Sequence, residues 1–313
     1  MFTCIFRRLL MASLLVAAVA SLPACFAADA KPPTMPAPPV TPASPGTPAN
    51  GADPVRKETW DYVASSKEIL KKFTGKQGVV LHLGDSITRG AGYGAWALGG
   101  KGKTDEDKKI LEWMHCGAKD DTDGWTLANR VNASGNDSSS ETASNGMRTD
   151  ELIKGGKNKL PPLDDILKKF NPQMVVLMLG TNDAWQKKTA DEAITGITPV
   201  IERLHANGTV VILSSIPPHI LNPQMAEEFN GKLYELAKAK KMPFLDFYGE
   251  VVKRAPNGTW DGTILNKGDV HPTSGHWVDQ EPTEANFKQC GYLLRGWLSV
   301  QKIREVKEKV IGK

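Results

Sequence analysis

One stretch constrains the fold of this chain more than any other: residues 79–90, which read VVLHLGDSITRG. An apolar run rich in β-branched residues leads directly into Gly84-Asp85-Ser86, a pattern that predicts a buried parallel strand ending in a tight turn. Ligand sites in open α/β sheets lie just beyond the carboxyl ends of strands, so we expect the Ser86 hydroxyl at such a site. Gly84 allows the bend where a Cβ would collide, and the Asp85 side chain can tie the turn.

Strand and helix patterns alternate along the rest of the chain. A short helix is expected between Trp60 and Phe73, and the later predicted elements are strands at 174–179, 210–213 and 244–247 and helices at 163–170, 191–206, 225–241 and 286–310. Strands alternating with helical runs imply a mostly parallel sheet with helices on both faces. We expect one α/β domain over residues 55–313.

The N-terminal residues 1–28 have the pattern of an export signal. Arg7 and Arg8 precede an apolar run that is too short for a comfortable membrane span, and small residues follow it. Residues 22–25 resemble a bacterial lipoprotein box, but Pro23 is out of place there, so we favour simple cleavage over a lipid anchor at Cys25. The protein is therefore expected to be exported, to the periplasm or outside the cell.

Residues 29–54 form a proline-rich linker without apolar periodicity, for which a stiff extended conformation is expected. Without the signal, the formal charge of +4 falls to about +2, which argues against nucleic acid as a partner. Cys116 and Cys290 would remain, and in an oxidising compartment they allow either one disulfide or two separate buried thiols.

Three further segments between the predicted strands have sequence patterns of their own. Gly90 to Ala95 match a dinucleotide fingerprint, but the glycines start several residues after the strand and no acid-ended second strand follows, so nucleotide binding is disfavoured. Residues from about 95 to 140 are polar and weakly periodic, and we expect an inserted loop region over the carboxyl edge of the sheet. Residues 149–152 read as a helix start with Thr149 as its cap.

Four short segments occur in a characteristic order: Gly84-Asp85-Ser86, Asn145-Gly146, Gly180-Thr181-Asn182-Asp183 and Asp269-Val270-His271-Pro272. Each is common by chance, but together they resemble the blocks of the SGNH (GDSL-type) hydrolase family. The resemblance covers Gly84–Pro272 and implies a flavodoxin-like three-layer sandwich. It also implies a serine esterase that works through an acyl-enzyme.

The resemblance assigns roles that suit the residue types. Ser86 would be the nucleophile and His271 its base, because acyl transfer needs both together with donors aimed at the oxyanion. The oxyanion hole would combine the backbone N–H groups of Ser86 and Gly146 with the side-chain amide of Asn182. Glycine permits close approach of substrate to the backbone, and an amide donates without charge.

The acid of the triad departs from the family pattern. The family places it three residues before the histidine, where this chain has Gly268, whereas Asp269 lies two residues before. In an extended segment residues i and i+2 project to the same side, so Asp269 could still reach the ring of His271. In a turn it would not be certain to do so. His276 is a rival base, without an acid at the family's spacing.

Substrate contacts are predicted at Trp185 and Asp85. An aromatic face can stack on a sugar ring, and Trp185 follows the third block directly, although core packing is the commoner use of the tryptophans at 96, 113, 125, 185 and 277. This favours small acyl esters, acetyl above all, on carbohydrate. The alternatives are a lysophospholipase or thioesterase of the same fold and a non-catalytic carbohydrate-binding relative. We expect no cofactor, and no metal because Cys and His do not cluster.

Overall fold

The computed structural model describes residues 53–132, 134–274 and 281–312. The predicted signal sequence, nearly all of the proline-rich linker and Cys25 lie outside these residues, and so do His276 and Trp277. No helix among the described residues is long and apolar enough to cross a membrane.

A four-stranded parallel sheet forms the centre of the domain, in the order β1-β2-β3-β4. Its strands are Val80–Gly84, Met174–Met178, Val210–Ser214 and Phe244–Leu245, and all of their residues are buried. The predicted strands are thus confirmed to within two residues at each end. Burial on both faces explains why these strands read as continuous apolar runs and not as alternating ones.

The outer edge of β1 is covered by a single bridge. Ala143 pairs with Gly84 in parallel, Ser144 donates its N–H to Gly84 O over 3.2 Å, and the Thr142 hydroxyl donates to His82 O over 2.8 Å. This bridge occupies the place that the second strand takes in the flavodoxin-like order 2-1-3-4-5. The predicted α/β fold is therefore present, with that strand reduced to one residue pair.

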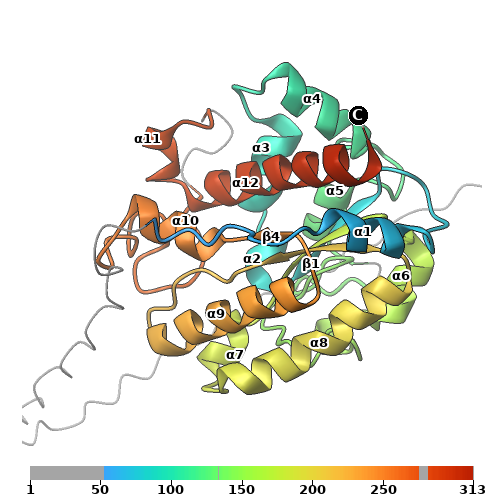
Figure 1. The fold of residues 1–313 in the computed structure, drawn as a ribbon. Coiled ribbons are helices and arrows are strands. Elements are labelled where there is room, and N and C mark those ends of the chain that lie inside the picture. Colours follow the sequence, from blue (N-terminus) through green and yellow to red (C-terminus); the bar gives the residue numbers. More distant parts are fainter. Residues whose placement is uncertain (1–52, 133, 275–280, 313) are drawn as a thin grey trace, which may run out of the picture. The chain divides into compact units, whose positions relative to one another are not determined.

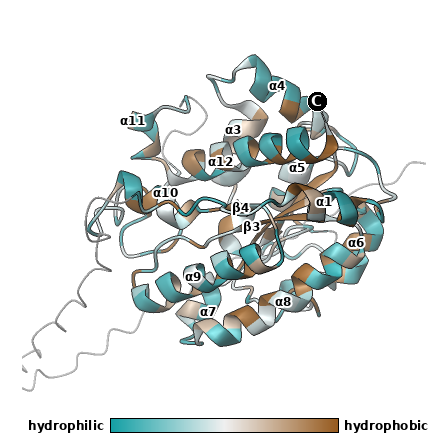
Figure 2. Ribbon diagram, in the orientation of Figure 1, coloured by the Kyte–Doolittle hydropathy of each residue, from teal (hydrophilic) through white to brown (hydrophobic). Residues whose placement is uncertain are grey.

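Helices cover both faces of the sheet (Figure 1). One layer contains α6 (Leu163–Phe170), α8 (Ala190–Ala206) and α9 (Pro223–Ala239). The other contains α3 (Gly92–Gly99), α4 (Asp105–Trp113), α5 (Gly124–Asn129) and α12 (Gly291–Val306). Helix α6 shows why these helices pack on the sheet: its buried residues recur at helical spacing and so form one apolar face, made of Leu163, Ile166, Leu167 and Phe170. In Figure 2 the two outer helices α6 and α8 are banded, with hydrophilic and hydrophobic residues in alternation along each ribbon.

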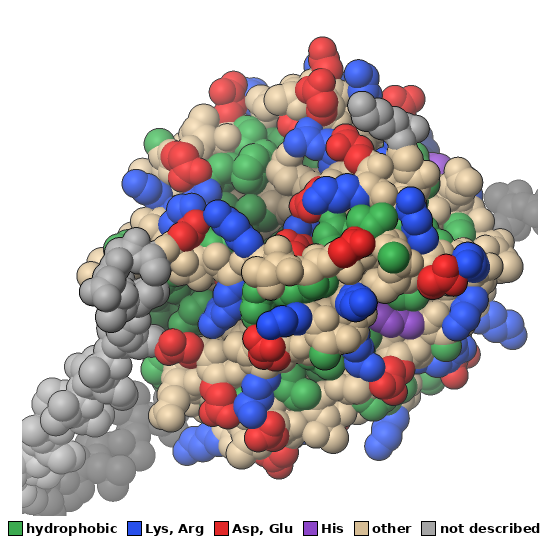
Figure 3. All heavy atoms as spheres, in the orientation of Figure 1, with side chains coloured by type: hydrophobic (Ala, Val, Ile, Leu, Met, Phe, Trp, Pro, Cys, Tyr) green, Lys and Arg blue, Asp and Glu red, His purple; other side chains and the backbone are tan. Residues whose placement is uncertain are grey.

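The remaining elements are short or lie at the borders: α1 (Val63–Leu70), α2 (Ser86–Arg89), the 3-10 turn η1 (Lys157–Lys159), α7 (Thr181–Trp185), α10 (Phe247–Arg254), α11 (Glu284–Phe287) and the C-terminal η2 (Lys307–Ile311). The long helix expected over 286–310 is interrupted between α11 and α12. Basic and acidic side chains are intermingled over the face shown in Figure 3.

The region from about 95 to 140 differs from the loop region that we expected. It includes the end of α3 and the whole of α4 and α5, and these helices contact α12 and β1. Trp96 and Trp125 are almost fully buried in the core, so their size stabilises this layer. The part up to Asn129 therefore belongs to the second helical layer. The described residues between 130 and 140 are a loop that pairs with the segment beside the carboxyl end of β1, through the bridge of Ser139 with Ser144 and the Asn145 N–H on Ser138 O.

The glycines at 90–94 serve helix packing. A Cβ on Gly90 would lie 2.2 Å from the Tyr292 hydroxyl oxygen, and one on Gly92 would lie 2.7 Å from the Tyr292 ring. These glycines therefore let α3 approach α12 closely, which accounts for them without a nucleotide phosphate. Cys116 and Cys290 are both free thiols, as in the second of the two cysteine alternatives, but only Cys290 is buried and Cys116 is partly exposed.

Candidate active site

Ser86 lies where the chain leaves β1. A Cβ on Gly84 would approach the Met178 carbonyl oxygen of β2 to 2.6 Å, so the strand end requires glycine. Asp85 then caps α2, because its Oδ1 accepts the Ile87 N–H over 3.0 Å. Ser86 is the first residue of this short helix and is only partly buried.

His271 reaches Ser86 from a tight loop. The Asn266 N–H donates to His271 O over 2.9 Å, and the Asp269 N–H donates to Asn266 O over 3.0 Å. Gly268 has a φ of 71°, a left-handed conformation that glycine adopts without strain. The segment before His271 is thus a turn and not an extended strand, and Asp269 stands at the end of that turn.

Ser86, His271 and Asp269 form a continuous chain of hydrogen bonds. The His271 Nε2 is 2.8 Å from the Ser86 Oγ, and its Nδ1 is 2.9 Å from each Asp269 carboxylate oxygen. Because a carboxylate only accepts, Nδ1 carries the proton and Nε2 is free to accept from the serine hydroxyl. Partial burial raises the pKa of Asp269, but the hydrogen bond and the charge of His271 outweigh it and hold this pKa below its ordinary value.

Gly146 follows the bridge on the edge of β1. Its φ is 72°, so a non-glycine residue would be strained, and a Cβ placed there would lie 3.3 Å from Lys157 Cε. Within the described part of the chain, neither the Gly146 N–H nor the Ser86 N–H has a hydrogen-bond acceptor. Both groups can therefore donate to a ligand.

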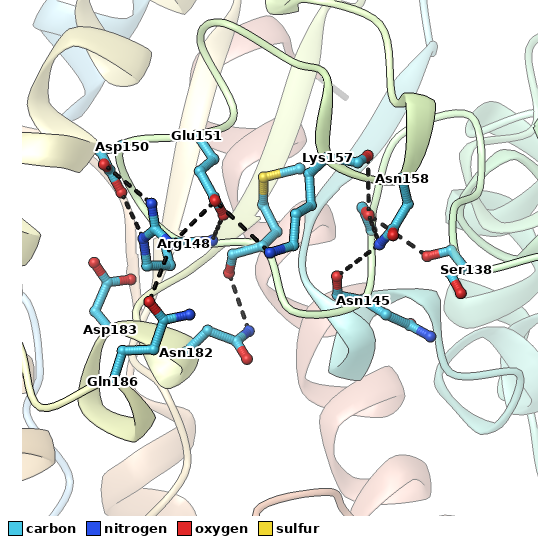
Figure 4. A network of polar contacts seen from close by, with 12 residues as sticks. Ser138, Asn145, Arg148, Asp150, Glu151, Lys157, Asn158, Asn182, Asp183 and Gln186 are labelled. Atoms are coloured by element: carbon cyan, nitrogen blue, oxygen red, sulfur yellow. Dashed lines mark hydrogen bonds and ion pairs between the residues drawn. The ribbon is translucent and has the colours of Figure 1, made fainter. Parts of the chain in front are cut away.

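Asn182 belongs to α7, which begins directly after the loop that leaves β2. Its Nδ2 donates to Met147 O over 3.0 Å and to Asp85 Oδ2 over 3.3 Å. Figure 4 shows Asn182 beside Asp183 on this helix, below the loop that carries Arg148. The expected third donor thus lies between the first and second blocks, where both of its present partners are acceptors.

Two contacts hold these loops together, one buried and one partly buried. Asp183 accepts the Thr149 N–H over 3.0 Å and the Thr149 hydroxyl over 2.8 Å, and burial raises the pKa of Asp183 against these hydrogen bonds. Thr149 therefore does not cap a helix as expected, since residues 149–154 form turns. The Asn158 amide donates to Asn145 O over 2.9 Å, directly before Gly146. Sequence reasoning missed both contacts because turns leave no periodic pattern.

The two residues predicted to contact substrate occupy different environments. Trp185 is 50% exposed and packs edge-on against His219, with ring centroids 5.7 Å apart. Asp85 is fully buried, so direct contact between its side chain and substrate does not fit this structure. Burial is the largest cause that raises the pKa of Asp85, to about 6, and the Ile87 N–H and the charges of Arg295 and His271 oppose it.

The other histidines of the described domain are structural in their contacts. His82 is fully buried against Trp125, and its Nδ1 lies 3.0 Å from the Tyr93 hydroxyl. Burial lowers the pKa of His219 to about 4, which keeps that ring neutral. Among the residues that the structure describes, no group of three or more His, Cys, Asp or Glu is placed to hold a metal ion.

Comparison with known proteins extends this description. A search of curated proteins finds no match. Solved structures with a similar arrangement include a GDSL-like lipase from Bacteroides thetaiotaomicron, 18% identical, covering 78% of this chain and 99% of that one with a TM-score of 0.47. They also include a member of the lipolytic G-D-S-L family from Veillonella parvula (19%, 71% and 96%, 0.44) and a carbohydrate esterase family 3 protein from Talaromyces cellulolyticus (19%, 72% and 98%, 0.46).

These structural similarities are too low to carry an argument about substrate. The family comparison is stronger, because the sequence profile of one family spans residues 82–275 and so includes Ser86, Gly146, Asn182 and His271. The resemblance seen in the four blocks is thereby confirmed. The chain belongs to the GDSL-like lipase/acylhydrolase family and is an ester-hydrolysing serine hydrolase.

Proposed function

We propose that this protein removes small acyl groups, acetyl above all, from carbohydrate through an acyl-enzyme on Ser86. The observation that carries the proposal is the chain of hydrogen bonds from Ser86 through His271 to Asp269, beside N–H donors that have no acceptor in the described structure. A nucleophile, a base, an orienting acid and oxyanion donors are the parts that acyl transfer needs.

The reaction follows from this geometry. His271 Nε2 takes the hydroxyl proton as the Ser86 Oγ attacks the ester carbonyl carbon, and Asp269 stabilises the imidazolium. The negative oxygen of the tetrahedral intermediate is stabilised by the N–H groups of Ser86 and Gly146, and by the Asn182 amide once one of its two hydrogens leaves its present acceptor. His271 then protonates the departing alcohol. Water, activated by the same imidazole, hydrolyses the acyl-enzyme and restores Ser86.

The preference for a carbohydrate ester is supported by Trp185. It lies three residues after Asn182 on α7, so the two side chains project from the same side of the helix. Half of its surface is exposed, and an indole face offers a flat apolar surface for a sugar ring. Leu221, 65% exposed, follows His219 closely in sequence and favours the second candidate, a lysophospholipase or thioesterase with a longer acyl group.

Hydrolysis of p-nitrophenyl acetate tests the reaction. Ser86→Ala and His271→Ala are each expected to lower kcat at least about 1000-fold, because the triad acts as a unit. Ser65→Ala is the matched control and should retain activity, because Ser65 lies on α1 and its hydroxyl donates to Tyr62 O and Lys241 O. Turnover that survives Ser86→Ala would end the proposal and would leave the non-catalytic relative or another nucleophile.

Substrate class is tested separately. Acetyl esters should be hydrolysed at least about tenfold faster than octanoyl esters. Trp185→Ala should raise KM for acetylated xylan more than KM for p-nitrophenyl acetate, because only the xylan offers a sugar ring to the exposed indole face. A preference for octanoyl esters would favour the lipid or thioester candidate.

We also propose that the protein is exported by cleavage near residue 28, a segment outside the described residues. The support is the sequence of that segment, in which a basic start precedes an apolar run and small residues. The intact mass of the protein purified from its native cells should correspond to a chain that begins near Asp29. A mass that includes a lipid on Cys25 would favour the anchored alternative, and a full-length chain would contradict export.

A further inference from the structure

The side chain of Asp85 is the most unusual ionisable group near the site. It directly precedes Ser86, has no exposed surface, and caps α2 through the Ile87 N–H. A buried carboxylate is costly unless its oxygens are hydrogen-bonded, and a neutral serine or asparagine would cap the helix as well. Capping alone therefore does not explain an acid at this position.

The second oxygen of Asp85 has a different partner, the amide of Asn182. This amide donates to Asp85 Oδ2 over 3.3 Å and to Met147 O over 3.0 Å. A side-chain amide can rotate by 180° and exchange its oxygen with its nitrogen. An ionised carboxylate and a carbonyl both only accept, so together they admit only the orientation in which the nitrogen faces them. Both hydrogens of this nitrogen are occupied in the structure, so donation to an oxyanion requires that one of them leaves its acceptor. With Asp85 Oδ2 keeping one hydrogen, the hydrogen on Met147 O is the one that turns to the oxyanion.

We propose that Asp85 is a positioning residue, whose ionised carboxylate keeps the amide of Asn182 aimed as an oxyanion donor. The inference rests on the proposed function, because it presupposes that Asn182 donates to the oxyanion. Asp85 touches no substrate in this arrangement. It acts through Asn182, and the substrate contact first expected of it is replaced by this indirect role.

The surroundings of Asp85 favour the ionised form at neutral pH. Arg295, 1% exposed, donates to Ile87 O over 2.9 Å and to the Thr88 hydroxyl over 3.0 Å, and so places a buried positive charge beside α2. His271 is the second basic group that lowers the pKa of Asp85. The buried Tyr292 also lies near, since the charge of Asp85 contributes to raising the pKa of the Tyr292 hydroxyl. Burial nevertheless raises that pKa to about 6.

Protonation of Asp85 would turn one of its oxygens into a donor and remove the constraint on Asn182. Hydrolysis should then depend on two deprotonated groups, Asp85 and His271. The acid limb of the kcat/KM profile is accordingly expected to be steeper than a single titration in the wild type. A residue with a purely structural role would not change the steepness of this limb.

The experiment compares Asp85→Asn, Asn182→Ala and the double variant on p-nitrophenyl acetate at pH 8. Asn182→Ala should lower kcat about 100- to 1000-fold, as removal of an oxyanion donor does. Asp85→Asn should lower kcat about tenfold or more, with KM changed less than threefold. In the double variant, Asp85→Asn should cost less than about threefold beyond Asn182→Ala, because its effect passes through Asn182. Its acid limb should fit one proton.

Asp123→Asn is the matched control. Asp123 caps α5 with the same geometry, Oδ1 accepting the Trp125 N–H over 3.0 Å, and is 1% exposed. If Asp85→Asn lowers kcat no more than Asp123→Asn, or costs the same factor with and without Asn182, the positioning role is overturned. An unchanged acid limb in Asp85→Asn would also overturn it. A wild type that does not hydrolyse the ester would instead overturn the proposed function itself.

Discussion

At the scale of single residues, the orientation of the His271 ring depends on the turn that brings the Asp269 carboxylate to its Nδ1. The spacing from Asp269 to His271 predicted contact only in an extended segment. The structure has a turn, closed by the Asn266 carbonyl and by a left-handed Gly268, and both carboxylate oxygens still lie 2.9 Å from the ring. Turn conformation depends on hydrogen bonds between residues that a spacing rule does not contain.

Asp269→Asn tests that contact. An amide can orient the imidazole in the wrong tautomer, with Nε2 protonated, so kcat for p-nitrophenyl acetate should fall about 100- to 10,000-fold. Asp261→Asn is the control, since Asp261 supports the same loop by accepting the Gly268 N–H over 2.7 Å. A loss below about threefold in Asp269→Asn would show that another group orients His271. Equal losses in both variants would assign the effect to loop folding.

At the scale of elements, prediction succeeded where burial imposes a repeating pattern. The strands and α6 were predicted well because apolar residues fill them at period 2 or 3.6, or continuously. The helices α2 and α7 were not predicted, because four or five residues are too few to show a period. These two helices present Ser86 and Asn182, so the site was found through its motifs and not through its secondary structure.

Asn158 is expected to control the element that carries Gly146. Its amide donates to Asn145 O and to the Ser144 hydroxyl oxygen, each over 2.9 Å, while its own φ is 48°. Asn158→Ala should lower the free energy of unfolding by about 1–3 kcal/mol and kcat about tenfold, because it removes both hydrogen bonds and strains the left-handed backbone.

Asn158→Gly separates the two causes. Glycine adopts the left-handed conformation freely but lacks the amide. Asn158→Gly should therefore recover most of the stability that Asn158→Ala loses, but little of the kcat that it loses. Thermal unfolding and steady-state kinetics measure the two quantities. Full recovery of kcat in Asn158→Gly would mean that the hydrogen bonds to residues 144 and 145 do not position Gly146.

At the scale of the whole molecule, the parallel sheet explains how distant segments meet. β1 and β2 are neighbours in the sheet, and the bridge at Ala143 lies on the free edge of β1. The carboxyl ends of β1 and β2, together with this bridge, therefore bring the first three blocks to one edge of the sheet, although Ser86 and Asn182 are 96 residues apart in the sequence. The order of the blocks in the sequence implied that they lie together at this edge. The sequence did not show that the strand expected beside β1 is reduced to a single bridge.

The same packing makes stability depend on pH. His205, on α8, has a buried Nε2 without a partner among the described residues, and burial, followed by the charges of Lys240 and Lys72, lowers its pKa to about 4. In the unfolded chain this histidine binds a proton near its ordinary pKa of 6.5, so its contribution to stability is fully present above pH 6.5 and is lost as the pH falls towards 4. Asp85 has the opposite effect on stability: because its pKa is raised to about 6, its contribution is lost as the pH rises and not as it falls.

His205→Gln isolates one of these contributions, because glutamine does not titrate. Relative to this variant, the wild type should lose about 1–2 kcal/mol of unfolding free energy between pH 7.5 and pH 4.5, less than full burial would give because the side chain is partly exposed. Between pH 7.5 and pH 9 the difference should stay constant, which serves as the internal control. Denaturant unfolding at the three pH values measures it. A difference that is the same at pH 4.5 and pH 7.5 would mean that His205 is hydrated in the folded protein, and that acid lability of this domain arises from other buried groups.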